Sequence, residues 1–241
     1  MRVLVTGAAG AIGKPVCELL AQRGHELRRF DRIPSGDSAL TADIANTQAV
    51  FDACAGVDAI VHLAATPDEA PFLELVPPNV IGVFNVLDAA RRHHVGRVVL
   101  ASSVQVAWSS GPEQKRDATH AAPRNHYALA KLWTEQMAEM YCRLHHMSII
   151  AVRIGWMVRT VAEAAHMRAR SMMRNYISRR DISHFMACAL EAPNLEYNLF
   201  YAVGPGGADS YDLDSPRRAI GYEPQDHFPN GLPFELPPEG S

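Results

Sequence analysis

The first thirteen residues constrain the fold of this 241-residue chain more than any other segment. A short apolar run, Val3 to Val5, leads directly into Gly7, Gly10 and Gly13, and a helical pattern follows at once. The first glycine allows a tight turn, the second lets backbone approach a ligand, and the third lets the helix pack on the strand. The start of the helix then presents unpaired N–H groups to an anion. The segment predicts a loop that binds a dinucleotide pyrophosphate, although a glycine triplet alone also marks ordinary turns.

Apolar runs alternate with helical stretches along most of the chain, which is typical of a parallel sheet covered on both faces. We expect strands at residues 3–6, 26–31, 59–63, 97–102, 148–153 and 199–203, with a shorter one near Leu40. We expect helices at residues 12–23, 47–53, 80–93, 127–145 and 182–191. The sequence therefore predicts an α/β fold, a Rossmann-type doubly wound parallel sheet.

The chain is long enough for one α/β domain, which we divide into two portions. Residues 1–156 are the expected dinucleotide-binding core, and residues 157–241 a small substrate-binding or lid portion of the same domain. Within it, residues 162–174 are rich in Ala, Met and Arg and have helical propensity, so this segment is a candidate lid. From Glu223 the chain is proline-rich, and its end, residues 233–241, is expected to pack loosely or to be disordered.

Composition excludes several other classes of protein. The four cysteines lie far apart, and the adjacent histidine pairs at 93–94 and 145–146 do not share a helix face, so we expect no metal site. A net charge of −3 gives no support to a nucleic-acid partner. No uninterrupted apolar run reaches about 18 residues and no leader pattern is present, so we expect a soluble, cytoplasmic protein without a membrane partner.

Asp31 bears on the identity of the dinucleotide. It ends the second expected strand, where a carboxylate can accept both hydroxyls of the adenosine ribose and so favour NAD. A solvated turn aspartate is the alternative. Arg32, with Arg28 and Arg29 nearby, could instead hold a 2′-phosphate, so NADP stays open.

Tyr127 and Lys131 form the strongest catalytic signal. Residues four apart share a helix face, and an ammonium beside a phenol lowers the pKa of the phenol, so that it can act as acid or base. Ser102 and Ser103 end the preceding strand, where a hydroxyl could bind and polarise a substrate oxygen. The spacing predicts a site for proton transfer, although such a pair also arises by chance in helices.

Together with the glycine loop, these motifs resemble the extended short-chain dehydrogenase/reductase family, also called the NAD-dependent epimerase/dehydratase family. The match covers residues 1 to about 156 closely and the remainder loosely. The resemblance implies that Ser103, Tyr127 and Lys131 are the catalytic trio and that Asn79 supports the site from its helix. The motifs that carry it, in chain order, are Thr6–Gly13, Asp31, Asp43–Ile44, His62–Ala65, Asn79–Asn85, Ser102–Ser103, Tyr127–Lys131 and Arg153–Gly155.

The motifs and the resemblance together imply a cofactor site. For Asp43, a helix N-cap is an equally good interpretation. The residues expected to contact NAD, or alternatively NADP, are Gly7, Gly10, Ala11, Ile12, Gly13, Asp31, Arg32, Asp43, Ile44, Leu63, Ala64, Ala65, Asn79, Ala101, Tyr127, Lys131 and Ile154.

Within the family the chain looks most like uronate dehydrogenases, which oxidise C1 of a free hexuronic acid and pass hydride to NAD. It departs from them at Val104 and Gln105, where they carry Asn-His, and at Trp156, where they carry serine. Their arginine for the substrate carboxylate falls at Ser171 here, although Arg168, Arg170 and Arg174 are close by. Apolar replacements remove the hydrogen bonds that select a polar substrate. We therefore expect a less polar substrate, bound by Gln105, Trp156 and Arg159.

The expected function is NAD(P)-dependent oxidoreduction, with hydride moved between nicotinamide and a carbinol or carbonyl carbon of a small substrate. The alternatives are a sugar epimerase or dehydratase that keeps its NAD bound, and a non-catalytic cofactor sensor. The resemblance also implies a homodimer formed by two helices. The apolar residues that those helices carry are Phe84, Leu87, Trp133, Met137, Met140 and Tyr141.

Overall fold

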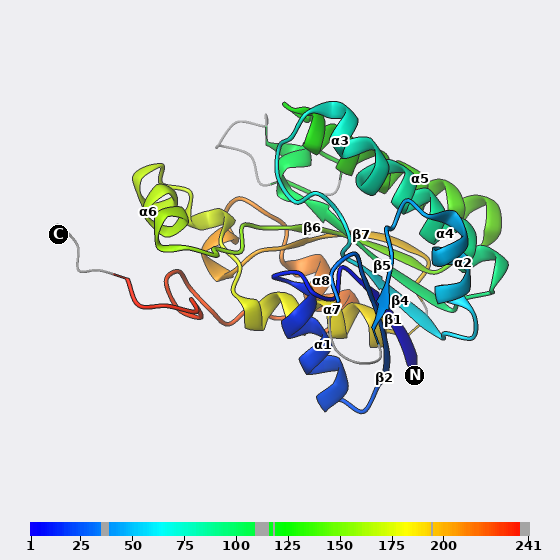
Figure 1. Ribbon diagram of the computed structural model, residues 1–241. Coiled ribbons are helices and arrows are strands. Elements are labelled where there is room, and N and C mark those ends of the chain that lie inside the picture. The colour runs from blue at the N-terminus through cyan, green and yellow to red at the C-terminus, as the bar shows by residue number, and fades with distance from the viewer. Residues whose placement is uncertain (35–38, 109–115, 118, 194, 237–241) are drawn as a thin grey trace.

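The protein folds around one parallel sheet of seven strands, in the order β3-β2-β1-β4-β5-β6-β7 (Figure 1). The computed structural model describes residues 1–34, 39–108, 116–117, 119–193 and 195–236. The predicted Rossmann-type fold is confirmed, and every expected strand is present. The strands are β1 (Arg2–Thr6), β2 (Glu26–Asp31), β3 (Leu40–Thr41), β4 (Ala59–His62), β5 (Arg97–Ser103), β6 (Ile149–Ile154) and β7 (Tyr197–Ala202).

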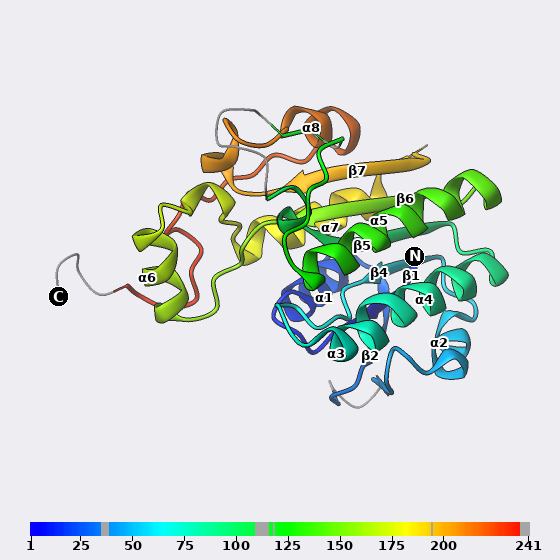
Figure 2. The same cartoon turned by 90° about the horizontal axis from the view of Figure 1, so that it is seen from above.

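Helices cover both faces of the sheet (Figures 1 and 2). One face packs α1 (Gly13–Gln22), α7 (Arg179–Glu191) and α8 (Asp214–Ile220) around an apolar core that includes Val16, Leu20 and Phe185. The opposite face packs α2 (Thr47–Cys54), α4 (Gly82–Arg92) and α5 (His126–His145) around a second core. Burial on both faces explains why the strands are continuous apolar runs rather than alternating ones.

The chain order reverses between β1 and β4, which lie side by side at the centre of the sheet. From β1 the chain builds outward to β2 and β3, then returns to β4 and builds outward on the other side. In sheets of this kind the loops at the carboxyl ends of the strands part at the reversal and leave a crevice for a ligand. The glycine loop follows β1 directly, so it lies at this crevice.

The helical run before β5 begins earlier than expected. It comprises α3 (Phe72–Val76), a π-helical turn (Pro77–Ile81) and α4, whereas the sequence predicted a helix from residue 80. Two prolines at the turn hide the continuous helix from a propensity reading. By length and composition Phe72–Arg92 could cross a membrane, but 44% of its most apolar window is buried in the protein, as in a core helix.

The portion after β6 contributes β7 to the sheet and extends beyond it as α6 (Val161–Ala169) (Figures 1 and 2). The expectation of a loosely packed end is wrong up to Leu236. Phe228, Leu232, Phe234 and Leu236 pack against the cluster of buried residues that contains Ala164 and Met167 of α6. Alternate side chains of this proline-rich segment are apolar, which supplies one packed face without a helix or strand. Residues 237–241 lie outside the described residues.

Candidate active site

A cleft of about 1160 Å³ opens at the carboxyl ends of the strands. It runs from the glycine loop to the segment between β6 and α6. It collects residues from β2, β5 and β6, from the loops that follow β1 and β4, and from the start of α5. The expected site residues that line it are Gly7, Gly10, Ala11, Ile12, Gly13, Asp31, Arg32, Asp43, Ile44, Leu63, Ala64, Ala65, Ala101, Ser103, Gln105, Tyr127, Lys131, Ile154, Trp156 and Arg159.

The glycine loop is a backbone cradle in which side chains have no room. A Cβ on Gly13 would lie 2.0 Å from the Gly7 carbonyl oxygen, and a Cβ on Gly7 would lie 2.7 Å from Ala64 N. Gly7 also has a φ of 73°, which other residues rarely adopt. Helix α1 begins here with no side-chain cap and no acidic residue in its first turn. Lys14 N bonds the Gly10 carbonyl at 3.1 Å, and the Gly13 N–H and the helix dipole remain for an anionic ligand, so the loop fits a pyrophosphate.

Asp31 stands at the far wall of the cradle. Its Oδ2 accepts a hydrogen bond from Ala9 N at 2.8 Å, and its Oδ1 accepts one from Ile33 N at 3.1 Å. The carboxylate is thus tied to the glycine loop and fixed in orientation at the cleft wall. Arg32 is exposed beside it and also lines the cleft.

Two other residues expected to contact the cofactor, Asp43 and Asn79, form hydrogen bonds within the protein. Asp43 accepts a hydrogen bond from Ala45 N at 2.8 Å, and the N-cap of α2 is Asn46, so Asp43 is not the helix cap. Asn79 is buried and does not line the cleft. Its amide bonds both backbone groups of Thr66, at 2.8 and 3.0 Å. Asn79 therefore supports the cleft wall, because Thr66 itself lines the cleft.

The structure brings Ser103, Tyr127 and Lys131 together on one wall. Ser103 hydrogen-bonds the Tyr127 phenol and accepts a bond from Gln105 N at 3.2 Å. Lys131 Nζ lies 5.8 Å from the centre of the Tyr127 ring and donates to the Ala101 carbonyl at 3.0 Å. All three side chains are buried. The arrangement offers a phenol and a hydroxyl to one substrate oxygen.

The pKa of Tyr127 shifts in the direction opposite to the one expected from the sequence. Burial raises the pKa of Tyr127 to about 12, although the bond from Ser103 opposes the shift. The same burial lowers the pKa of Lys131 to about 8, and the charge of Glu135 opposes that shift. The expected lowering of the phenol pKa by Lys131 is therefore outweighed by desolvation. At neutral pH the phenol is protonated and the amine carries its charge.

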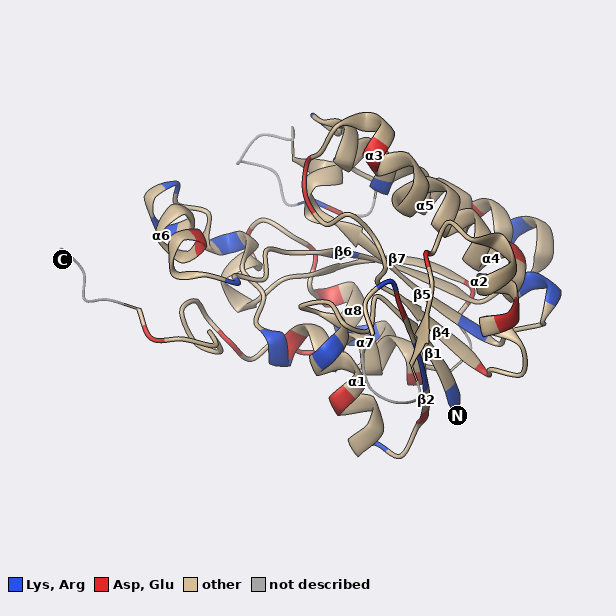
Figure 3. Ribbon diagram, in the orientation of Figure 1, with Lys and Arg blue, Asp and Glu red and all other residues tan. Residues whose placement is uncertain are grey.

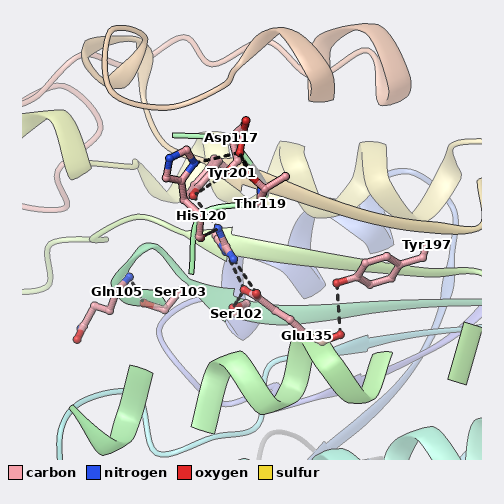
Figure 4. Close-up of polar contacts among 10 residues, drawn as sticks. Ser102, Ser103, Gln105, Asp117, Thr119, His120, Glu135, Tyr197 and Tyr201 are labelled. Atoms are coloured by element: carbon pink, nitrogen blue, oxygen red, sulfur yellow. Dashed lines mark hydrogen bonds and ion pairs between the residues drawn. The ribbon is translucent and has the colours of Figure 1, made fainter. Parts of the chain in front are cut away.

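A buried ion pair behind the wall was not predicted. Glu135 accepts hydrogen bonds from Ser102 Oγ at 2.5 Å and from Arg153 Nε and Nη2 at 2.8 Å each. Arg153 Nη1 reaches on to the His120 carbonyl and the Tyr201 hydroxyl. Figure 4 shows Glu135 of α5 facing Ser102 at the end of β5. The sequence signal was available, since Glu135 falls one helical turn beyond Lys131 and Arg153 begins the Arg-Ile-Gly motif.

The substrate end of the cleft is formed by Val104, Gln105 and Trp156. The Gln105 side-chain oxygen accepts a hydrogen bond from Asn125, the N-cap of α5, at 3.1 Å. The Trp156 indole N–H donates to Glu163 of α6. The Gln105 side-chain oxygen and the Trp156 N–H thus have partners within the protein, and Val104 and the Trp156 ring present apolar surface to the cleft.

The charge of Arg159 is balanced by two carboxylates, those of Glu163 and Asp68. Its Nε donates to Glu163 Oε1 at 2.9 Å, and its Nη2 lies 3.0 Å from Asp68 Oδ2. Basic residues lie on and beside α6 and at the start of α7 (Figure 3). Among the residues that the structure describes, however, none of Arg168, Arg170 and Arg174 lines the cleft. No freely available arginine from this segment therefore faces the position of a substrate carboxylate.

Three comparisons bear on this geometry. The NAD dependent epimerase/dehydratase family matches residues 3–158. A uronate dehydrogenase of Pseudomonas syringae pv. tomato is 31% identical over 93% of this chain and 82% of its own length. An NAD-dependent glucose-6-phosphate dehydrogenase of Haloferax volcanii is 28% identical over 93% of both chains.

A solved structure agrees with the fold. The crystal structure of a uronate dehydrogenase mutant from Agrobacterium tumefaciens, complexed with NAD, superposes with a TM-score of 0.78 at 29% identity. The match covers 93% of this chain and 84% of that one. The likeness therefore extends through β7 and beyond the portion that the family profile matches.

Proposed function

This chain belongs to the NAD dependent epimerase/dehydratase family, and from that premise we propose how its cleft works. The protein is an NAD-dependent oxidoreductase. It moves hydride between the cofactor and a carbinol or carbonyl carbon of a small substrate. The observation that carries the proposal is the joint placement of Ser103, Tyr127 and Lys131 in one cleft with the glycine cradle.

The residues of the cradle fit NAD. The N–H groups at the start of α1 would hold the pyrophosphate, because no side chain caps them. Asp31 would accept the ribose hydroxyls, and Ala64 and Ala65 leave room for the dinucleotide against the backbone. When bound, NAD supplies the acceptor or donor of the hydride.

The protein's own groups handle the proton and the substrate oxygen. In the reducing direction the neutral Tyr127 phenol donates its proton to the carbonyl oxygen, and in the oxidising direction the phenolate takes that proton back. Ser103 binds the same oxygen and stabilises charge that develops on it. Lys131 holds the ribose through its ammonium and favours the phenolate when it forms. The pKa of about 12 keeps the Tyr127 phenol in its protonated form at neutral pH, which is the form that can donate a proton.

The substrate is proposed to be uncharged and less polar than a free uronic acid. Val104 and Trp156 present apolar surface, and Arg159 is already paired with Asp68 and Glu163. Glu69 and Glu74 line this cleft together with Arg124, so the charge of the wall does not by itself favour a carboxylate. Residues 157–241, which carry Arg159 and α6, are proposed to be the substrate portion.

The function is tested by following NADH absorbance with uncharged aldoses and aromatic alcohols, and with carbonyl compounds in the reverse direction. Hydride transfer predicts net NADH formation or consumption that depends on the substrate. Tightly bound NAD in the purified protein, with isomerisation of a sugar and no net change in external NADH, would instead identify an epimerase. Absence of both activities, with NADH binding retained, would identify a cofactor sensor.

We further propose that the protein is a cytoplasmic homodimer. The proposed interface is formed by the exposed faces of α4 and α5. Phe84 and Met140 are 46% and 39% exposed, whereas Leu87 and Tyr141 are buried beneath them. Only part of the expected apolar set is therefore free to meet a second copy. Light scattering at micromolar concentration should give the mass of two chains, and a monomer would contradict the proposal.

A further inference from the structure

Helix α5 carries three buried polar side chains at successive intervals of four residues. Tyr127, Lys131 and Glu135 are 6%, 5% and 3% exposed. Residues at this spacing lie on one face of a helix, so all three point toward the sheet. Tyr127 and Lys131 belong to the proposed catalytic group, whereas Glu135 has no assigned role.

The end of β5 meets all three side chains. Its last three residues, 101–103, each supply one polar contact to this face of α5. The contacts are the Ala101 carbonyl with Lys131 Nζ at 3.0 Å, Ser102 Oγ with Glu135 Oε1 at 2.5 Å, and Ser103 with the Tyr127 phenol. Helix and strand are therefore joined by a ladder of three contacts, two of which involve catalytic side chains.

Arg153 holds Glu135 rigidly in this ladder. The guanidinium binds both carboxylate oxygens, and neither side chain is more than 4% exposed. A bidentate, charge-assisted pair of this kind fixes orientation as well as charge. The Arg153 Nη1 bonds to His120 and Tyr201 anchor the pair to the loop before α5 and to β7. Glu135 is thus fixed one helical turn from Lys131, with its carboxylate bound to Arg153.

We propose that Glu135 is a positioning residue, which holds the Lys131 ammonium in its charged form at the cleft wall and fixes the strand end that carries Ser103. The inference rests on the proposed function, because it concerns the group that would bind the cofactor ribose. It extends the catalytic pattern on α5 from Tyr-x-x-x-Lys to Tyr-x-x-x-Lys-x-x-x-Glu.

The groups facing Lys131 allow its titration to be isolated. They are Tyr127 and Glu135 from α5, His62 from β4 and the Ala101 carbonyl from β5. Burial lowers the pKa of His62 to about 3 and raises the pKa of Tyr127 to about 12. Burial lowers the pKa of Lys131 to about 8 against the effect of Glu135. Neither His62 nor Tyr127 changes its charge near pH 8, so an event there reports on Lys131.

The test is the dissociation constant of NADH, measured by its fluorescence from pH 6 to pH 10, which needs no substrate. In the wild type the constant should rise above about pH 8 as Lys131 loses its charge. Lys131→Met should remove this rise. Glu135→Gln should move it about one pH unit lower, the size expected for loss of one nearby opposite charge. Glu135→Asp, which keeps the charge, should move it less.

Glu139→Gln is the matched control, because Glu139 is exposed one turn further along the same helix. Its curve should superpose on that of the wild type. If Glu135→Gln fails to fold, the double variant Glu135→Met/Arg153→Met removes the pair without leaving a buried charge alone, and should shift the rise in the same direction.

Each outcome decides a different claim. If the dissociation constant of NADH rises at the same pH in Glu135→Gln as in the wild type, the role of Glu135 is overturned. The double variant, where it is used, is judged in the same way. A wild-type curve without a rise overturns the role of Lys131 and with it this inference. Failure of the wild type to bind NADH at any pH contradicts the proposed function itself.

Discussion

The cofactor end of the cleft is made largely of backbone, whereas the substrate end is made of side chains. Gly7, Gly13 and Ala64 approach so closely that a single Cβ would collide with a neighbouring main chain. At the other end, Gln105 and Trp156 are held by hydrogen bonds to Asn125 and Glu163. Backbone cradles bind what every dinucleotide shares, while side chains select among substrates. One end is thus fixed by the fold, and the other can change without disturbing it.

Among substitutions that distinguish the cofactor end of the cleft from the substrate end, removal of the Tyr127 hydroxyl should have the largest effect. Tyr127→Phe should lower kcat by about 10²–10⁴-fold, because general acid catalysis is removed. NADH binding should stay within about twofold of wild type, since the glycine cradle is untouched. Tyr141→Phe, on the same helix but away from the cleft, is the control and should keep full activity. Unchanged turnover in Tyr127→Phe would refute the assigned role.

A methyl group at Gly13 tests the cofactor end in the opposite way. The new Cβ would lie 2.0 Å from the Gly7 carbonyl oxygen, so the loop must move. NADH affinity should fall by at least about tenfold, as for loss of one or two hydrogen bonds to an anion. The matched control is Gly206→Ala, where nothing lies within 4 Å of the added atom. Equal NADH titrations for Gly13→Ala and wild type would show that the loop is not the cradle.

The cofactor end should also be the acid-sensitive one, because His62 is buried there beside Thr6 at 2.7 Å. Burial lowers the pKa of His62 to about 3 from 6.5, so the folded state keeps it neutral while the unfolded state binds a proton. Stability is therefore present above pH 6.5 and is lost as pH falls toward 3.

Urea unfolding should show a loss of about 2 kcal/mol from this group between pH 7 and pH 5. In His62→Gln that part of the pH dependence should vanish, while His227→Gln, an exposed position, should keep it. Identical slopes for His62→Gln and wild type would place the acid sensitivity elsewhere.

A smaller effect is expected from opening the substrate end. Trp156→Ser restores a hydroxyl where the chain has an indole, so kcat/KM for galacturonate should rise about tenfold relative to an uncharged sugar, the scale of one added polar contact. NADH binding should not change, which makes the cofactor titration an internal control. A fall in relative uronate turnover would show that Trp156 does not set this preference.

The same contrast explains what could be predicted from the sequence. The cofactor end was readable because glycine spacing and strand position report directly on backbone geometry, and Gly7, Asp31 and Lys131 all line one cleft. Several features escaped prediction. The pairing of Arg159 with Asp68 joins residues 91 positions apart. The sign of the Tyr127 pKa shift depends on burial, which no local pattern records. Helix α3 was hidden by the prolines of the following turn.

The most direct test is a comparison of kcat/KM with NAD for galacturonate and glucuronate against galactose and glucose. The two pairs differ at the carboxylate and share the reacting carbon. If only the substrate end of the cleft is altered, NAD should still support turnover. The kcat/KM of each uncharged sugar should then exceed that of its uronate by at least about tenfold, the scale of one lost polar contact. Efficient oxidation of either uronate, above its uncharged counterpart, would contradict the account.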